Sequence, residues 1–217
     1  MQFDVQVIVD SLPFLAEGLV LSFQLTLLAI VGGLAFGTVL AIMRNSGIVP
    51  LVWIAAIYVN FFRSLPLILV IFWFYFLVPL VIGEAVGSFQ SALIAFTLFE
   101  AAYYSEIMRA GLSSVSRGQI NAGYALGFSW RQNMQFVILP QAFRNMLPVL
   151  VTQCIILFQD TSLVYVVALR DFMTAASVVA TREGRLIELY VFAALVYFVI
   201  CFAGSLFVRR LQKRKVA

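Results

Sequence analysis

The chain has 217 residues, of which 63% are apolar and 11% are charged, and its mean hydropathy is +1.03. Soluble domains are about half apolar and about a quarter charged, so disorder, a secreted disulfide scaffold and a soluble nucleic-acid binder are excluded. The net charge is +4 and no histidine is present, which excludes imidazole chemistry. Cys154 and Cys201 lie in apolar runs and predict neither a disulfide framework nor a zinc site.

Five apolar segments are long enough to cross a bilayer, whose core requires about 20 helical residues. Residues 1–17 are acidic and lack the basic start of a signal peptide, so the first span is expected to be retained. All five runs are continuously apolar rather than alternating, which predicts an all-α fold and not a β-barrel. The predicted spans are residues 18–43, 64–82, 92–108, 146–169 and 187–208.

The second apolar segment lies within residues 51–82 and is interrupted by Arg63 and Pro66. We expect an interfacial piece up to about Phe62, followed by a span that begins near Ser64. One long, tilted and kinked helix is the alternative.

Basic residues gather on one side of these spans. Ten basic residues lie on one side: one directly after span one, four in residues 109–145 and five in the tail. The other side has three arginines, all between spans four and five. The asymmetry predicts a periplasmic segment at 1–17, a permease domain at 18–208 with its 109–145 loop in the cytoplasm, and a cytoplasmic basic tail at 209–217. The ten residues are Arg44, Arg109, Arg117, Arg131, Arg144, Arg209, Arg210, Lys213, Arg214 and Lys215.

The 109–145 loop is much longer than an ordinary connection and has a helical pattern of its own. Residues 121–126 can form a short helix that ends at Gly127, in the left-handed conformation. Ser129 fits the N-cap of a second helix, which is expected to end at Leu139-Pro140. Such a helix–Gly–helix element is either an amphipathic hairpin on the membrane surface or a docking element for a cytoplasmic partner.

The same stretch resembles the cytoplasmic signature loop of ABC-importer permeases. That signature is Glu-Ala-Ala, three residues, Gly, nine residues, an aliphatic, one residue and Leu-Pro, and its spacing is met in full. The matching residues are Asn121-Ala122-Gly123, Gly127, Val137 and Leu139-Pro140. Asn121 replaces the Glu and Gly123 replaces an Ala. The literal Glu100-Ala101-Ala102 has Glu106 where the Gly is required, so it is not the signature.

Further motifs are similar to those of polar amino-acid permeases, most of all the glutamate/aspartate branch, over residues 100–118 and 157–166. These motifs are Phe62-Arg63-Ser64-Leu65-Pro66, Tyr104-Ser105-Glu106, Arg109-Ala110-Gly111, Gly118-Gln119 and Asp160-Thr161-Ser162-Leu163. The resemblance implies a multi-pass inner-membrane protein with five transmembrane helices and the MetI-like permease core of type I ABC importers.

The resemblance also implies the partners of the chain. They are a cytoplasmic ABC ATPase dimer, a second permease subunit, a periplasmic amino-acid-binding protein and membrane lipid, with no nucleic acid. The chain has no phosphate-binding loop, so it is expected to be non-catalytic and to bind no cofactor, with ATP and Mg on the partner ATPase. The residues implied in ATPase coupling are Gly118, Gln119, Asn121, Ala122, Gly123, Leu126, Gly127, Leu139 and Pro140.

Polar residues inside predicted spans are candidates for a substrate pathway, because such residues are costly in lipid. The candidates are Arg63, Glu100, Asp160, Thr161 and Ser162. Arg63 can attract a substrate carboxylate, or it can pair with Glu100 or Asp160. The hydroxyls of Thr161 and Ser162 can line the pathway or bond back to their own helix. Glu106 and Arg109, three residues apart, are expected to pair locally.

Other transport functions remain open at this point. The substrate can be another polar amino acid, such as glutamine, histidine or arginine. An ion-coupled secondary transporter is a weaker alternative, because such proteins have more spans and an internal repeat. An intramembrane enzyme is weaker still, because the chain shows no convincing nucleophile and base.

Overall fold

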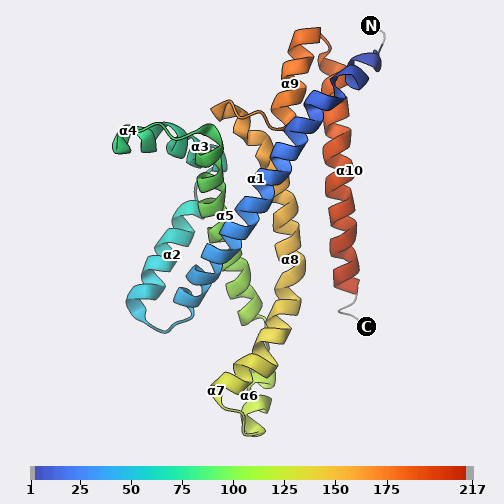
Figure 1. The fold of residues 1–217 in the computed structure, drawn as a ribbon. Helices are drawn as coiled ribbons and strands as arrows, with labels where there is room; N and C mark the ends of the chain where they lie inside the picture. Colours follow the sequence, from blue (N-terminus) through green and yellow to red (C-terminus); the bar gives the residue numbers. More distant parts are fainter. Residues whose placement is uncertain (1–2, 214–217) are drawn as a thin grey trace.

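A computed structural model describes residues 3–213, and the elements within these residues are all helical. They are α1 (Gln6–Arg44), α2 (Val49–Arg63), α3 (Leu67–Phe72), the π-turn η1 (Trp73–Leu77), α4 (Val78–Ile82), α5 (Ser88–Ser113), α6 (Arg117–Ala125), α7 (Trp130–Asn133), the π-turn η2 (Met134–Ile138), α8 (Leu139–Asp160), the 3₁₀ helix η3 (Thr161–Val167), α9 (Phe172–Glu183) and α10 (Leu186–Lys213). The start of α1 and the pair α6–α7 lie at opposite ends of the molecule (Figure 1).

Three of the described helices are long and apolar enough to cross a membrane: Gln6–Arg44, Trp130–Val167 and Leu186–Gln212. The bent pair Val49–Arg63 and Leu67–Ile82 makes a fourth if it counts as one span. The predicted third span lies in α5, which is not among them because it carries several polar and charged residues. Since α5 packs against α1, α2, α3 and α8, several of those residues, among them Glu100 and Ser105, are buried within the protein.

Small residues allow α1 and α5 to pack closely along most of their length. Gly33 and Gly37 are both buried on α1. A β-carbon on Gly33 would lie 3.0 Å from the Glu100 Cβ, and one on Gly37 would lie 2.9 Å from the Ala101 carbonyl oxygen. Close backbone approach through glycine is typical of helix pairs in membranes, where van der Waals packing drives association.

The second apolar segment differs from the expected arrangement. Here α2 lies alongside α1 and α5, whereas Leu67–Ile82 turns away by 104° and runs crosswise (Figure 1). The break falls at Ser64-Leu65-Pro66, because a proline provides no N–H and disfavours helical geometry in the residue before it. The part expected at the interface therefore follows the long helices, and the part expected to span does not.

The helix that follows Ser129 also differs, because Leu139-Pro140 does not end it. The π-turn η2 joins α7 to α8, and the helix continues from Trp130 to Val167. A proline ring conflicts with the carbonyl four residues earlier, here that of Phe136, and the wider π-turn around Phe136 accommodates it. We call this continuous unit the α7–α8 helix.

A short helix, α9, occupies part of the predicted connection between the last two spans. The Asp171 carboxylate accepts hydrogen bonds from the backbone N–H groups of Met173 and Thr174, both at 3.0 Å, and so caps α9. The buried face of α9 packs with Leu15 of α1 and Leu189 of α10. The sequence analysis missed this helix, although the N-cap signal of Asp171 was present.

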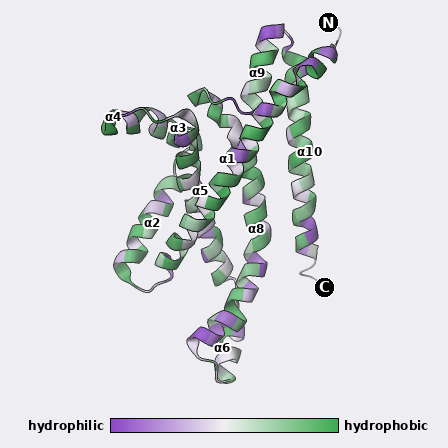
Figure 2. Ribbon diagram, viewed as in Figure 1, coloured by the Kyte–Doolittle hydropathy of each residue, from purple (hydrophilic) through white to green (hydrophobic). Residues whose placement is uncertain are grey.

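Hydrophilic residues lie at both ends of the molecule, and apolar residues predominate between them (Figure 2). At the end with α9, Arg185 lies 3.7 Å from Asp4 and 3.3 Å from Glu188, and Arg182 lies 2.8 Å from Glu183. Two of the three arginines that diluted the predicted charge asymmetry are thus paired with acids. Arg214 and Lys215 of the basic tail lie outside the described residues.

Candidate functional site

The helix–Gly–helix element has the predicted caps at both of its inner boundaries. Gly127 adopts φ +80°, and its N–H donates to the Tyr124 carbonyl at 2.9 Å, while the Phe128 N–H donates to the Gly123 carbonyl at 3.1 Å. These two bonds form a Schellman motif, which ends α6 at a left-handed glycine. The predicted turn at Gly127 is confirmed, although α6 begins at Arg117, four residues before the expected start.

The second helix begins with a capping box. The Ser129 hydroxyl accepts a hydrogen bond from the Gln132 N–H at 3.4 Å, and the Gln132 side chain accepts one from the Ser129 N–H at 2.8 Å. This reciprocal pair satisfies N–H groups that the first helical turn leaves free, so the predicted N-cap at Ser129 is confirmed.

Nearly all of the residues predicted to contact a partner are exposed, most of them in residues 117–133, which we call the α6–α7 element, and the last two at the start of α8. Gly123 is the exception, because it is buried against Asn133 of α7. Large apolar side chains also lie on this surface, with Leu126 76% exposed and Trp130 62% exposed. The exposed members of the predicted set are Gly118, Gln119, Asn121, Ala122, Leu126, Gly127, Leu139 and Pro140.

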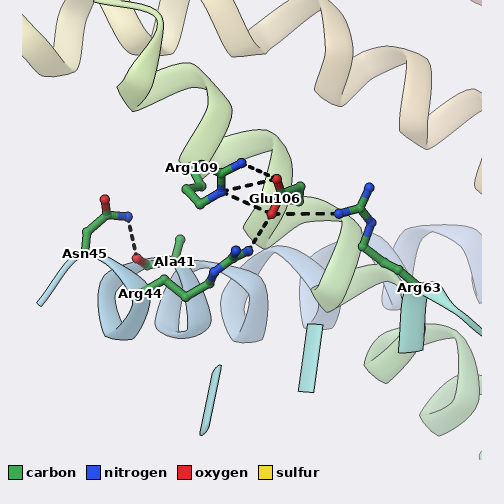
Figure 3. A network of polar contacts seen from close by, with 6 residues as sticks. All are labelled: Ala41, Arg44, Asn45, Arg63, Glu106 and Arg109. Atoms are coloured by element: carbon green, nitrogen blue, oxygen red, sulfur yellow. Dashed lines mark hydrogen bonds and ion pairs between the residues drawn. The ribbon is translucent and has the colours of Figure 1, made fainter. Parts of the chain in front are cut away.

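A cluster of charged residues joins α1, α2 and α5, and Glu106 lies at its centre (Figure 3). Its carboxylate accepts a hydrogen bond from Arg44 at 2.5 Å and pairs with Arg109 one turn along α5. Arg63 lies 3.8 Å from the same carboxylate. The predicted local pair of Glu106 and Arg109 is therefore confirmed, and we call these four residues the Glu106 cluster.

Arg63 does not have either of the partners that the sequence analysis suggested. The structure pairs it with Glu106 rather than with Glu100 or Asp160, and its guanidinium lies over the Tyr103 ring at 5.6 Å. The Arg63 side chain is 40% exposed and its ion pair is long, so it is the most loosely held arginine of the cluster. Arg44, at 15% exposure, is the most enclosed.

Glu100 is completely buried between α1, α5 and α8. One of its carboxyl oxygens accepts a hydrogen bond from the Gln153 side-chain amide of α8 at 3.1 Å, and the other has no partner among the described residues. Polar groups buried at membrane depth are costly unless they are paired, so this position is a candidate contact for a polar ligand.

The motif Asp160-Thr161-Ser162 marks the change from α8 to η3. The Thr161 hydroxyl donates to the Phe158 carbonyl at 2.7 Å, which is the back-bonding alternative for this residue. Ser162 lines a cavity of about 750 Å³ between η3, α9 and α10. Asp160 is half-buried, and the structure does not gather it with Arg63 into one site.

Three residues with clear contacts were not selected from the sequence as site residues. In the sequence, Arg44 contributes only to the charge asymmetry, and Asn133 is one polar residue among several in its loop. Gln153 gave a usable signal, because it is an amide within an apolar run. Its contact with Glu100 joins residues 53 apart, so residue spacing along the chain could not identify the pair.

Comparison with known proteins decides the family. Residues 33–216 match the model of the binding-protein-dependent transport system inner membrane component. The chain belongs to this family. It is therefore a non-catalytic, multi-pass inner-membrane permease subunit of an ABC importer.

Several relatives and structures are similar to this permease over nearly its whole length. The glutamate/aspartate import permease protein GltK of Escherichia coli O6:H1 is 50% identical, with 98% of each chain covered. The arginine transport system permease protein ArtQ of Bacillus subtilis is 33% identical, with 98% of this chain and 99% of the relative covered. A chain in the crystal structure of an amino acid ABC transporter with histidines has a TM-score of 0.93 at 29% identity, covering 99% of this chain and 100% of that one.

A more distant structure shares the fold alone. A chain of the inward-facing MetNI methionine ABC transporter gives a TM-score of 0.63 at 22% identity, covering 92% of this chain and 95% of that chain. The predicted all-α, MetI-like architecture is thereby confirmed.

Proposed function

We propose that this permease carries glutamate and aspartate into the cell as one membrane half of an ATP-driven importer. The observation that carries the proposal is its 50% identity, over 98% of both chains, to a glutamate/aspartate import permease. Transport assays in vesicles that hold the assembled importer test it directly. Uptake of glutamate and aspartate should require ATP and exceed uptake of glutamine, histidine and arginine, and a preference for one of those three would contradict the proposal.

The partners proposed here are those that the family implies, and each is assigned to an exposed part of the chain. The α6–α7 element would bind the cytoplasmic ATPase dimer, which supplies ATP and Mg, because its apolar and small residues lie free at one end of the molecule. A second permease subunit would complete the pathway, and a periplasmic binding protein would deliver the amino acid at the end with α9. Closure of the ATPases on ATP would move α6 and shift the spans between inward- and outward-facing states.

The proposed orientation places α6 in the cytoplasm and α9 outside. Cysteine introduced at exposed Ser116 should react with a membrane-impermeant thiol reagent in inside-out vesicles but not in intact cells. Thr181→Cys, at the exposed end of α9, is the matched control and should react in intact cells. Labelling of both positions from the same side would contradict the orientation.

Gly127→Val should separate ATPase binding from membrane insertion. Its φ of +80° costs a β-branched residue about 2 kcal/mol, although nothing would contact the added β-carbon. The end of α6 should therefore be distorted while the spans remain intact. ATPase bound per permease and substrate-stimulated hydrolysis are the measurements. Gly127→Asn tolerates this conformation better and should be milder, whereas normal coupling in Gly127→Val would show that α6 is not the coupling contact.

A further inference from the structure

Asn133 connects α6 to α7 from a completely buried position. Its side-chain amide nitrogen donates to the Ile120 carbonyl of α6 at 2.9 Å, across thirteen residues of chain. Its relative exposure is 0%, although Asn is usually found at surfaces. Ile120 and Met134, the residue next to Asn133, also pack against a small apolar cluster of Val115, Ile138 and Ala142. This hydrogen bond is a specific polar contact between the two helices.

Gly123 provides the space that Asn133 occupies. A β-carbon on Gly123 would lie 2.2 Å from the Asn133 Oδ1 and 2.9 Å from its Cγ, so even alanine would displace the Asn133 side chain. Displacement of the Asn133 side chain would disturb its 2.9 Å bond to Ile120, because the enclosed side chain has little room to move. Gly123 is also one of the two positions where this chain departs from the permease signature.

The Asn133 contact also reaches the membrane through the α7–α8 helix. Asn133 lies in the first turn of this helix, and Gln153 lies farther along it, bonded to buried Glu100. If α6 moves, the α7–α8 helix therefore moves with it, provided that the Asn133 contact holds the two helices together. Without the Asn133 contact, α6 would rest on α7 mainly through a few apolar side chains.

We propose that Asn133 is a positioning residue that holds α6 on the α7–α8 helix, so that movement of α6 reaches the spans, and that Gly123 is required to admit it. The inference rests on the proposed function of α6 as the ATPase contact. Asn133 would contact neither ATP nor the amino acid, and its effect would be on the number of amino acids transported per ATP hydrolysed.

A double-mutant cycle tests the proposal in the assembled importer, reconstituted in vesicles with its binding protein. The variants are Asn133→Ala, Gly123→Ala and the double variant, with Gln135→Ala as the matched control on the exposed side of the same helix. The measurements are ATPase bound per permease and glutamate transported per ATP hydrolysed. Each single variant should keep the ATPase bound and lower the transport ratio about tenfold, the scale of one lost buried hydrogen bond.

The double variant should lose about tenfold, no more than Asn133→Ala alone and not the product of the two losses, because Gly123→Ala acts by displacing an amide that the double variant lacks. If Gly123→Ala prevents insertion, recovery of insertion in the double variant is the equivalent supporting result. A double variant whose loss is the product of the two single losses, or an Asn133→Ala ratio equal to that of Gln135→Ala, would overturn the proposal. Whether α6 is the ATPase contact at all is tested separately, by the amount of ATPase bound to the Gly127→Val variant.

Discussion

Glu106→Ala should prevent the permease from assembling into a stable complex. The change leaves Arg44, Arg63 and Arg109 facing one another without the carboxylate that all three contact. Arg44 is enclosed at 15% exposure, so it cannot regain full hydration. Removing the shared partner of this partly buried cluster should cost about 3 kcal/mol, so the contacts of α1 and α2 with α5 should loosen at this end. Thermal unfolding in detergent and co-purification with the ATPase measure the loss.

Arg63→Gln is the control for that experiment. It removes the longest and most exposed contact of the Glu106 cluster, and exposed ion pairs contribute about 1 kcal/mol at most. The complex should remain assembled, so any fall in uptake would report on the pathway rather than on stability. If Arg63→Gln and Glu106→Ala lowered the stability equally, the burial of each contact in the Glu106 cluster would not determine how much it stabilises the protein.

Gly37→Leu should disrupt the packing of α1 on α5. The added side chain would start 2.9 Å from the Ala101 carbonyl oxygen and from the Tyr104 Cβ, and the carbonyl belongs to backbone that cannot rotate away. Overpacking of a close helix contact costs about 3 kcal/mol. We expect a lower melting temperature and loss of the complex. Both are measured after purification in detergent.

Ala35→Leu adds a larger side chain to the exposed face of α1, two residues away. It should leave stability within about 0.5 kcal/mol of the wild type, because that face has room for a larger side chain. If Gly37→Leu were equally mild, the α1–α5 interface would have to be more adaptable than the distances indicate.

Local signals explain which parts of the fold could be predicted. A left-handed Gly127 and an N-cap at Ser129 follow from one or two neighbouring residues, and both occur where expected. The family resemblance also depends on short motifs with fixed spacing, and the comparisons bear it out. Helices α1 and α10 follow from uninterrupted apolar composition, although α1 begins twelve residues before the predicted span.

Contacts between distant segments explain most of what was missed. The choice of Glu106 rather than Glu100 as the partner of Arg63 depends on how α2 lies against α5. The direction of Leu67–Ile82 depends on a single break, and composition does not tell which side of a break follows the bundle. Pro140 correctly indicates a departure from regular α-helix, but that departure is a π-turn and the helix does not end there.

The π-turn η2 also fixes the angular relation between the two ends of the α7–α8 helix. A π-turn contains one more residue than an α-turn, and one residue rotates the following helix faces by about 100°. Asn133 lies before the extra residue and faces α6, whereas Gln153 lies after it and faces α5. With an ordinary α-turn between Met134 and Ile138, Asn133 and Gln153 could not both keep these neighbours. The irregular turn thus sets the angle at which the same helix contacts α6 near its start and α5 farther along.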